Sequence, residues 1–176
     1  MKLAERLQGI ELILSDVDGV LTDGSLTFDN EGIETKTFNV RDGMGIALWQ
    51  KAGFRFGILT ARTSHIVQVR AAELSIDIVR QGFRDKLPAA VEIAQSLNLN
   101  LDQLCYIGDD LTDLPVLNAV GLSVAVADAV EEVRKAAHYT TRTPGGKGAV
   151  RELIETVLKS KNRWEDIVSK YQQRGA

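Results

Sequence analysis

A short apolar run that ends in two aspartates constrains this chain more than any other stretch. Residues 10–14 predict a buried strand, and the segment Asp16-Val17-Asp18-Gly19 that follows predicts a tight loop. Side chains two residues apart point the same way along a strand, so both carboxylates can face one cavity. Two bare carboxylates in such a place repel each other unless a cation lies between them or one holds a proton. A simple Asp-Gly turn is the alternative for this segment alone.

The rest of the 176-residue chain alternates short apolar strands with amphipathic helices. Such alternation is typical of crossover units, and it predicts a three-layer, Rossmann-like α/β fold: a parallel sheet with helices on both faces. We expect one domain over residues 1–176, with further strands at 54–59, 77–79, 104–107, 122–126 and 139–141. Residues 25–38 predict a β-hairpin that projects from this body in place of a cap domain, and residues 142–176 form a C-terminal tail.

Composition argues against several classes of function. The formal net charge is −3 with no basic run, no apolar stretch is long enough to span a bilayer, and residues 1–6 lack the apolar core of a signal peptide. The single cysteine, Cys105, lies in an apolar run and is expected in the core. We therefore expect a cytoplasmic protein with no nucleic-acid or membrane partner.

Polar side chains gather where three of the expected strands end, at the sheet edge where open parallel sheets bind ligands. Asp16 and Asp18 follow the first strand, Thr60 follows the second, and Asp109 follows a later one; Lys86 begins a helix between the last two. Carboxylates without His or Cys suit Mg²⁺, whereas a hydroxyl and an ammonium suit phosphate oxygens. The cluster predicts phosphoryl transfer, in which one aspartate attacks phosphorus and another carries the proton.

The chain resembles the phosphatases of the haloacid dehalogenase (HAD) superfamily over essentially its whole length. Their four motifs match, in order, Asp16-x-Asp18-Gly19-Val20, Thr60, Lys86 and Gly108-Asp109-Asp110-x-x-Asp113. The resemblance implies a HAD-like fold, Asp16 as nucleophile, and Asp18 as acid and base.

The same resemblance implies the remaining roles at this edge. Thr60 and Lys86 would hold the phosphoryl group, and Mg²⁺ would be held by the Asp16 carboxylate, the Asp18 backbone carbonyl and Asp109. Asp110 and Asp113 either support the metal shell or cap the helix that follows.

A narrower resemblance is to the 3-deoxy-D-manno-octulosonate 8-phosphate (KDO 8-phosphate) phosphatases, enzymes of lipopolysaccharide synthesis. It rests on residues 39–43, 59–62, 81–82, 85–86 and 145–152. It implies that a sugar acid phosphate is contacted by Asp18, Asn39, Val40, Arg41, Asp42, Gly43, Ala47, Arg62, Arg70 and Lys86. Arginines suit the sugar carboxylate because a guanidinium can bind it through two parallel hydrogen bonds.

The hairpin is too poor in apolar residues to cover its own site and also bury itself, although closure over the substrate benefits such a site. The resembling enzymes are tetramers in which hairpins associate and the glycine-rich tail can reach an adjacent site. We therefore predict a homotetramer with active sites at subunit junctions. The alternative for Gly145-Gly146-Lys147-Gly148 is a simple helix-entry loop.

Three other functions compete with this interpretation. A nonulosonate 9-phosphate phosphatase shares the scaffold but tends to have Glu at the position of Arg62, so Arg62 and residues 39–43 favour the octulosonate. A phosphoacceptor signalling domain lacks the paired aspartates after the lysine. A non-catalytic protein on a degraded scaffold is disfavoured because every motif residue is retained.

Overall fold

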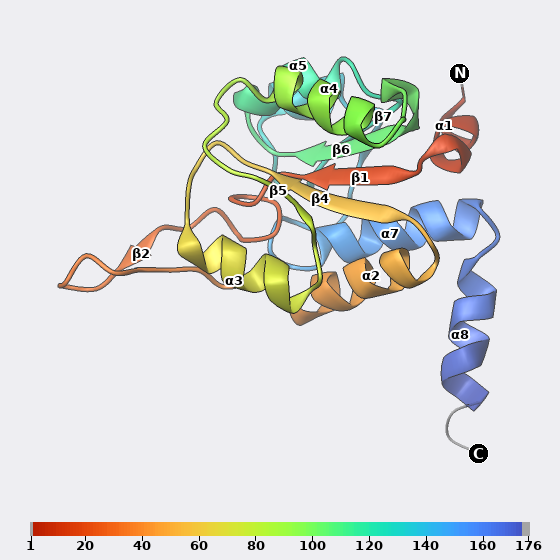
Figure 1. Ribbon diagram of the computed structural model, residues 1–176, viewed down its shortest axis with the longest axis horizontal. Helices are drawn as coiled ribbons and strands as arrows, with labels where there is room; N and C mark the ends of the chain where they lie inside the picture. The colour runs from red at the N-terminus through yellow and green to blue at the C-terminus, as the bar shows by residue number, and fades with distance from the viewer. Residues whose placement is uncertain (1, 174–176) are drawn as a thin grey trace.

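The computed structural model describes residues 2–173 and has a six-stranded parallel sheet at its centre (Figure 1). Its order is β5-β4-β1-β6-β7-β8, and every pair of neighbours is parallel. The strands are β1 (Leu12–Ser15), β4 (Arg55–Leu59), β5 (Ile78–Arg80), β6 (Leu104–Gly108), β7 (Leu122–Ala125) and β8 (Tyr139–Thr140). The predicted parallel α/β sheet is confirmed.

Helices cover both faces of this sheet, as Figure 1 shows. On one side lie α4 (Lys86–Ser96) and α5 (Leu114–Leu117), and on the other α2 (Val40–Lys51) and α7 (Ala149–Ser160), which pack against each other. The remaining helices are α1 (Leu3–Gly9), α3 (His65–Glu73), α6 (Glu131–Ala136) and α8 (Trp164–Gln173), with 3₁₀ turns η1 (Leu101–Gln103) and η2 (Leu111–Asp113). Within the described chain, every helix falls short of the length and apolarity needed to cross a bilayer.

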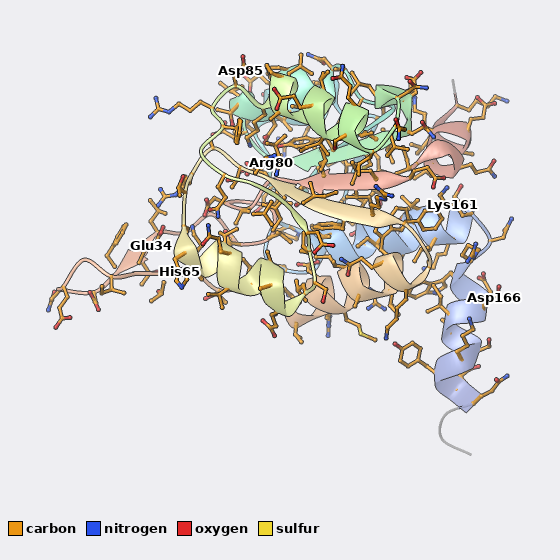
Figure 2. All side chains as sticks on the ribbon, in the orientation of Figure 1. Glu34, His65, Arg80, Asp85, Lys161 and Asp166 are labelled. Carbon is orange, nitrogen blue, oxygen red and sulfur yellow. The ribbon has the colours of Figure 1, made fainter. Side chains whose placement is uncertain are left out.

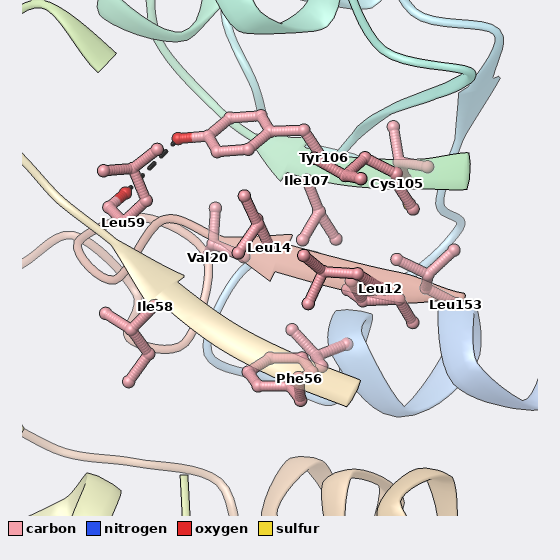
Figure 3. Packing of buried hydrophobic residues seen from close by; sticks show 14 of the residues in the cluster. Leu12, Leu14, Val20, Phe56, Ile58, Leu59, Cys105, Tyr106, Ile107 and Leu153 are labelled. Carbon is pink, nitrogen blue, oxygen red and sulfur yellow. Dashed lines mark hydrogen bonds between the residues drawn. The ribbon is translucent and has the colours of Figure 1, made fainter. Parts of the chain in front are cut away.

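The core surrounds β1, whose residues are all buried. Figure 3 shows apolar side chains of β1, β4 and β6 packed together, and Leu153 projects toward them from α7. Complete burial of one such side chain contributes about 1.5–3 kcal/mol, so this contiguous cluster is what holds the strand ends in place. Cys105 lies in this cluster as predicted, and burial raises the pKa of its thiol well above the usual range.

The hairpin is confirmed as a separate two-stranded ribbon that projects from the body (Figure 1). Its strands are β2 (Thr27–Phe28) and β3 (Glu34–Thr35). Asp29 closes the turn, because its Oδ1 accepts the backbone N–H groups of Glu31 at 2.9 Å and Ile33 at 2.8 Å.

The register of β1 places three strand ends side by side. Ser15 is aligned with Ile58 of β4 on one side and with Ile107 of β6 on the other. Since the strands are parallel, the chain leaves all three at the same edge of the sheet. Asp16, Thr60 and Asp109 follow at that edge, as the sequence predicts.

Candidate active site

A buried lysine connects these strand ends. Lys86, the first residue of α4, is 1% exposed. Its Nζ donates to Oδ2 of Asp16 at 2.7 Å, to Oδ1 of Asp113 at 2.6 Å and to the Tyr106 hydroxyl at 3.1 Å. Burial opposes the ammonium form, yet the charges of Asp16 and Asp113 hold the pKa of Lys86 above its ordinary value. Lys86 is therefore a fixed cation at the sheet edge.

Asp113 anchors this cluster because both of its carboxylate oxygens accept hydrogen bonds. Its Oδ1 also accepts from the Tyr106 hydroxyl at 2.7 Å, and its Oδ2 accepts the backbone N–H groups of Asp109 at 2.9 Å and Asp110 at 3.2 Å. Asp110 is exposed, and its own side chain accepts the N–H of Leu111. The structure shows capping by both aspartates, and for Asp113 it adds the ion pair with Lys86. Support of the metal shell stays a prediction.

The carboxylates are arranged as a cation site would require. Asp16, Asp109 and Asp113 each place one oxygen within 4.8 Å of the others. Oδ1 of Asp109 is buried with no hydrogen-bond partner. Burial, with the Asp113 charge second, raises the pKa of Asp109 to about 8 and that of Asp16 to about 6, Lys86 opposing both shifts.

A hard cation relieves this repulsion, so the donors fit Mg²⁺. Asp113 is completely buried, and both of its oxygens are bonded to Lys86, Tyr106 or the backbone. Asp16 is slightly exposed and Asp109 keeps one oxygen without a partner, so these two are the carboxylates that we expect to hold the ion. The loop after β1 is shaped to approach them: Gly19 has φ +87°, and a Cβ there would lie 2.0 Å from Oδ2 of Asp109.

Thr60 lies directly after β4 and is 2% exposed. Its backbone N–H donates to the carbonyl of Arg80 at 2.9 Å, and its carbonyl accepts from Phe83 at 3.2 Å. These two bonds fix the strand end that carries the hydroxyl.

Asp18 belongs to a second ionic network, which includes the base of the hairpin. Its Oδ1 accepts from the Lys36 ammonium, and its Oδ2 lies 3.6 Å from Nε of Arg62. Glu34 bridges the two cations, since its Oε1 is 2.6 Å from Nη2 of Arg62 and 3.3 Å from Nζ of Lys36. Figure 2 shows Glu34 on the side of the hairpin nearest the body.

Glu34 and Lys36 are site residues that the sequence did not predict. The hairpin was expected to contact a neighbouring subunit, and its base also contacts Asp18 of its own chain. The available signal was their spacing, because residues two apart on a strand share a face.

Two residues of the 39–43 segment contact distant parts of their own chain. The Asn39 side chain caps α2 by accepting the N–H of Arg41 at 2.8 Å, and it donates to the carbonyl of Gly146 at 3.3 Å. Asp42 is 2% exposed, and its Oδ1 accepts the N–H of Arg151 at 2.8 Å in the first turn of α7. Burial raises the pKa of Asp42 to about 6. No pattern in the sequence indicates that Asp42 caps a distant helix.

The other predicted substrate contacts are Arg70, Arg41, Val40 and Ala47. Arg70 packs against Gly43, where a Cβ would lie 2.5 Å from its Nη2, and pairs with Glu73 at 2.8 Å. Arg41 lines a groove with Arg142, Lys147 and Arg151. Val40 is exposed and Ala47 is half-buried. Within residues 2–173, no hydrogen bond or ion pair joins Arg41 or Arg70 to Asp16, Asp18 or Asp109.

The glycine-rich run packs on the loop after β1 of the same chain. A Cβ at Gly145 would lie 1.8 Å from the Gly19 carbonyl oxygen, and the N–H of Gly146 donates to Val20 at 2.9 Å. Gly148, at φ +110°, is the N-cap of α7. The run is therefore a helix-entry loop here, and its reach toward an adjacent site stays a prediction.

Comparison with known proteins places this geometry in a family. Residues 59–153 match the model of the haloacid dehalogenase-like hydrolases. The KDO 8-phosphate phosphatase of Yersinia pestis is 44% identical over 161 residues, which cover 92% of this chain and 86% of the relative. The chain belongs to the KDO 8-phosphate phosphatase family. It is therefore a phosphoric monoester hydrolase with a HAD-like fold, as the sequence predicts.

Solved structures of KDO 8-phosphate phosphatases agree with this assignment. One from Moraxella catarrhalis, in complex with magnesium ion, phosphate ion and KDO, gives a TM-score of 0.94 at 38% identity and covers 96% of this chain and 97% of that chain. A cobalt-bound structure from Haemophilus influenzae gives a TM-score of 0.88 at 39% identity, covering 90% and 93%. Both of these relatives bind a metal ion, which agrees with the carboxylate cluster of this chain.

Proposed function

We propose that this chain hydrolyses KDO 8-phosphate to the free sugar acid and phosphate, with Mg²⁺ as cofactor. The observation that carries the proposal is the buried Asp16–Lys86 pair beside Asp109, at the sheet edge of a chain in the KDO 8-phosphate phosphatase family. When bound by Asp16, the Asp18 carbonyl and Asp109, Mg²⁺ would neutralise charge on the transferring phosphoryl group.

The reaction proceeds in two steps on this chain's own residues. An Asp16 oxygen attacks phosphorus and the bond from phosphorus to the sugar oxygen breaks, while Asp18 gives its proton to that oxygen. Water then attacks the aspartyl-phosphate and loses its proton to Asp18, which releases phosphate and restores Asp16. Lys86 and Thr60 stabilise the charge on the equatorial oxygens throughout.

Arg62 is the residue best placed to select the substrate. Its side chain is 44% exposed, so it can receive a carboxylate while Glu34 holds it. A nonulosonate 9-phosphate is the alternative substrate. Phosphate release across a panel of sugar phosphates separates the two: KDO 8-phosphate should give the highest kcat/KM, and a preference for a nonulosonate 9-phosphate would overturn the proposal.

We also propose a homotetramer in which a neighbouring subunit completes each site. Two observations support it. Leu26, Phe28 and Ile33 of the hairpin are 50–57% exposed. Arg41 lines a groove with Arg142 and Lys147, and Asp16, Asp18 and Asp109 are not among the residues that line it. Light scattering of the wild type and of a Phe28→Lys/Ile33→Lys variant tests it. A monomeric wild type with full activity would refute the idea.

We also propose that the protein works in the cytoplasm. The buried, unpaired Cys105 supports this compartment because free thiols persist where disulfides are reduced.

A further inference from the structure

We propose that Lys36 is a positioning residue for Asp18, holding one oxygen of the proton carrier so that the other faces the leaving group. The inference rests on the proposed function, in which Asp18 protonates the sugar oxygen. Lys36 comes from the hairpin, and its side chain is only 1% exposed. A buried ammonium is costly unless it is paired, and Lys36 has two acidic partners, Asp18 and Glu34.

The two oxygens of Asp18 differ in their surroundings. Oδ1 accepts from Lys36, whereas Oδ2 is buried with no hydrogen-bond partner, and its nearest cation, Nε of Arg62, is 3.6 Å away. Without Lys36, the carboxylate is free to rotate and pair fully with Arg62. Lys36 therefore keeps Oδ2 available for proton transfer and Arg62 available for substrate.

Glu34 makes this arrangement a continuous chain of charges. It binds Arg62 and Lys36 through the same oxygen, so the order Arg62–Glu34–Lys36–Asp18 links the substrate-selecting arginine to the proton carrier. Because Glu34 and Lys36 both come from the hairpin, the placement of this ribbon on the body sets the orientation of Asp18.

The experiment compares two leaving groups. An alkyl phosphate such as KDO 8-phosphate needs a proton on its departing oxygen, whereas p-nitrophenolate is a stable anion that leaves with little help. The measured quantity is kcat/KM, which reports the step in which the leaving group departs. Lys36→Met keeps the side-chain length and removes the charge; Lys36→Arg restores a cation; Lys135→Met removes an exposed lysine as the control.

For Lys36→Met we expect kcat/KM on KDO 8-phosphate to fall roughly 100-fold, which is the lower end of what general acid catalysis supplies. On p-nitrophenyl phosphate, kcat/KM should fall less than about threefold. Asp18→Asn should show the same selective loss, Lys36→Arg should recover part of it, and Lys135→Met should match the wild type. An equal loss on both substrates, or no loss, would overturn the proposal.

Two further arms keep the outcome clear. If Lys36→Met does not fold, as judged by its melting curve, the same comparison is made with Lys36→Arg and Glu34→Gln, which should both lose activity selectively on the alkyl phosphate. If the wild type prefers another sugar phosphate, the proposed substrate is wrong. The leaving-group comparison is then repeated with that preferred alkyl ester, so a wrong substrate is distinguished from a wrong role for Lys36.

Discussion

The ammonium of Lys86 lies 2.7 Å from the carboxylate of Asp16, and both side chains are almost completely shielded from solvent. The pair connects the start of α4 to the end of β1, the central strand. Burial raises the pKa of Asp16, and the charge of Lys86 opposes that shift and favours the ionised carboxylate. An ionised carboxylate that Lys86 holds in one orientation is what the proposed attack on phosphorus requires.

Asp16→Asn should abolish phosphate release, with a loss on the order of 10⁴-fold or more, because an amide oxygen cannot form the aspartyl-phosphate. The substitution preserves shape, so the circular dichroism spectrum and melting temperature should stay close to those of the wild type. Turnover that persists in a variant shown by mass spectrometry to retain Asn would refute Asp16 as the nucleophile.

Lys86→Met should destabilise the fold as well as stop catalysis. It leaves Asp16 and Asp113 buried without their cation, and breaking a buried ion pair from one side costs about 3–5 kcal/mol. Adding Asp113→Asn removes one of the stranded charges, so the double variant should be more stable than the sum of the two single effects predicts. Urea unfolding of all four proteins gives the coupling energy. Simple additivity would contradict the pairing.

The sequence was sufficient for the sheet-edge cluster because that cluster follows from local patterns. Apolar runs give the strands, parallel pairing puts their carboxyl ends at one edge, and Asp16, Thr60 and Asp109 are the residues that come next. The long helices follow from their periodicity in the same way. Helix α1 was not predicted, since Leu7 is its only buried residue and one position makes no periodic pattern.

Contacts between segments far apart in the chain could not be predicted. Asp42 caps a helix that begins more than a hundred residues later, which depends on how α2 packs against α7. Lys36 contacts Asp18 because the base of the hairpin packs against the loop that follows β1. In both cases the sequence shows a charged residue, and only the tertiary structure shows its partner.

Gly19→Ala should impair metal binding specifically. A Cβ at Gly19 would lie 2.0 Å from Oδ2 of Asp109, so that carboxylate must move from its place in the cluster. Mg²⁺ should raise the melting temperature of the wild type, since a ligand of the native state stabilises it, but should do so much less in the variant. Chelation should stop wild-type activity, and added Mg²⁺ should restore it.

The matched control for this substitution is Gly53→Ala. Gly53 also has positive φ, +95°, but a Cβ there meets no atom within 4 Å. It should lose about 1 kcal/mol from backbone strain and keep its full response to Mg²⁺. An equal Mg²⁺ response in both alanine variants would show that the contact with Asp109 has no influence on the metal.

Asp42→Asn should change how stability depends on pH. The pKa of Asp42 rises from 3.8 to about 6 on folding, so its contribution to stability is complete below about pH 3.8 and is lost as pH rises through about 6. That loss amounts to about 3 kcal/mol, and asparagine, which does not ionise, avoids it. Asn retains an oxygen for the N–H of Arg151, and any cost of its buried NH₂ group is independent of pH. Urea unfolding between pH 4 and 8 measures the free energy of unfolding of both proteins. The value for the variant should rise relative to that of the wild type up to about pH 6, and the difference should stay constant above that pH. A difference that is constant across the whole range would refute the burial of an ionising Asp42.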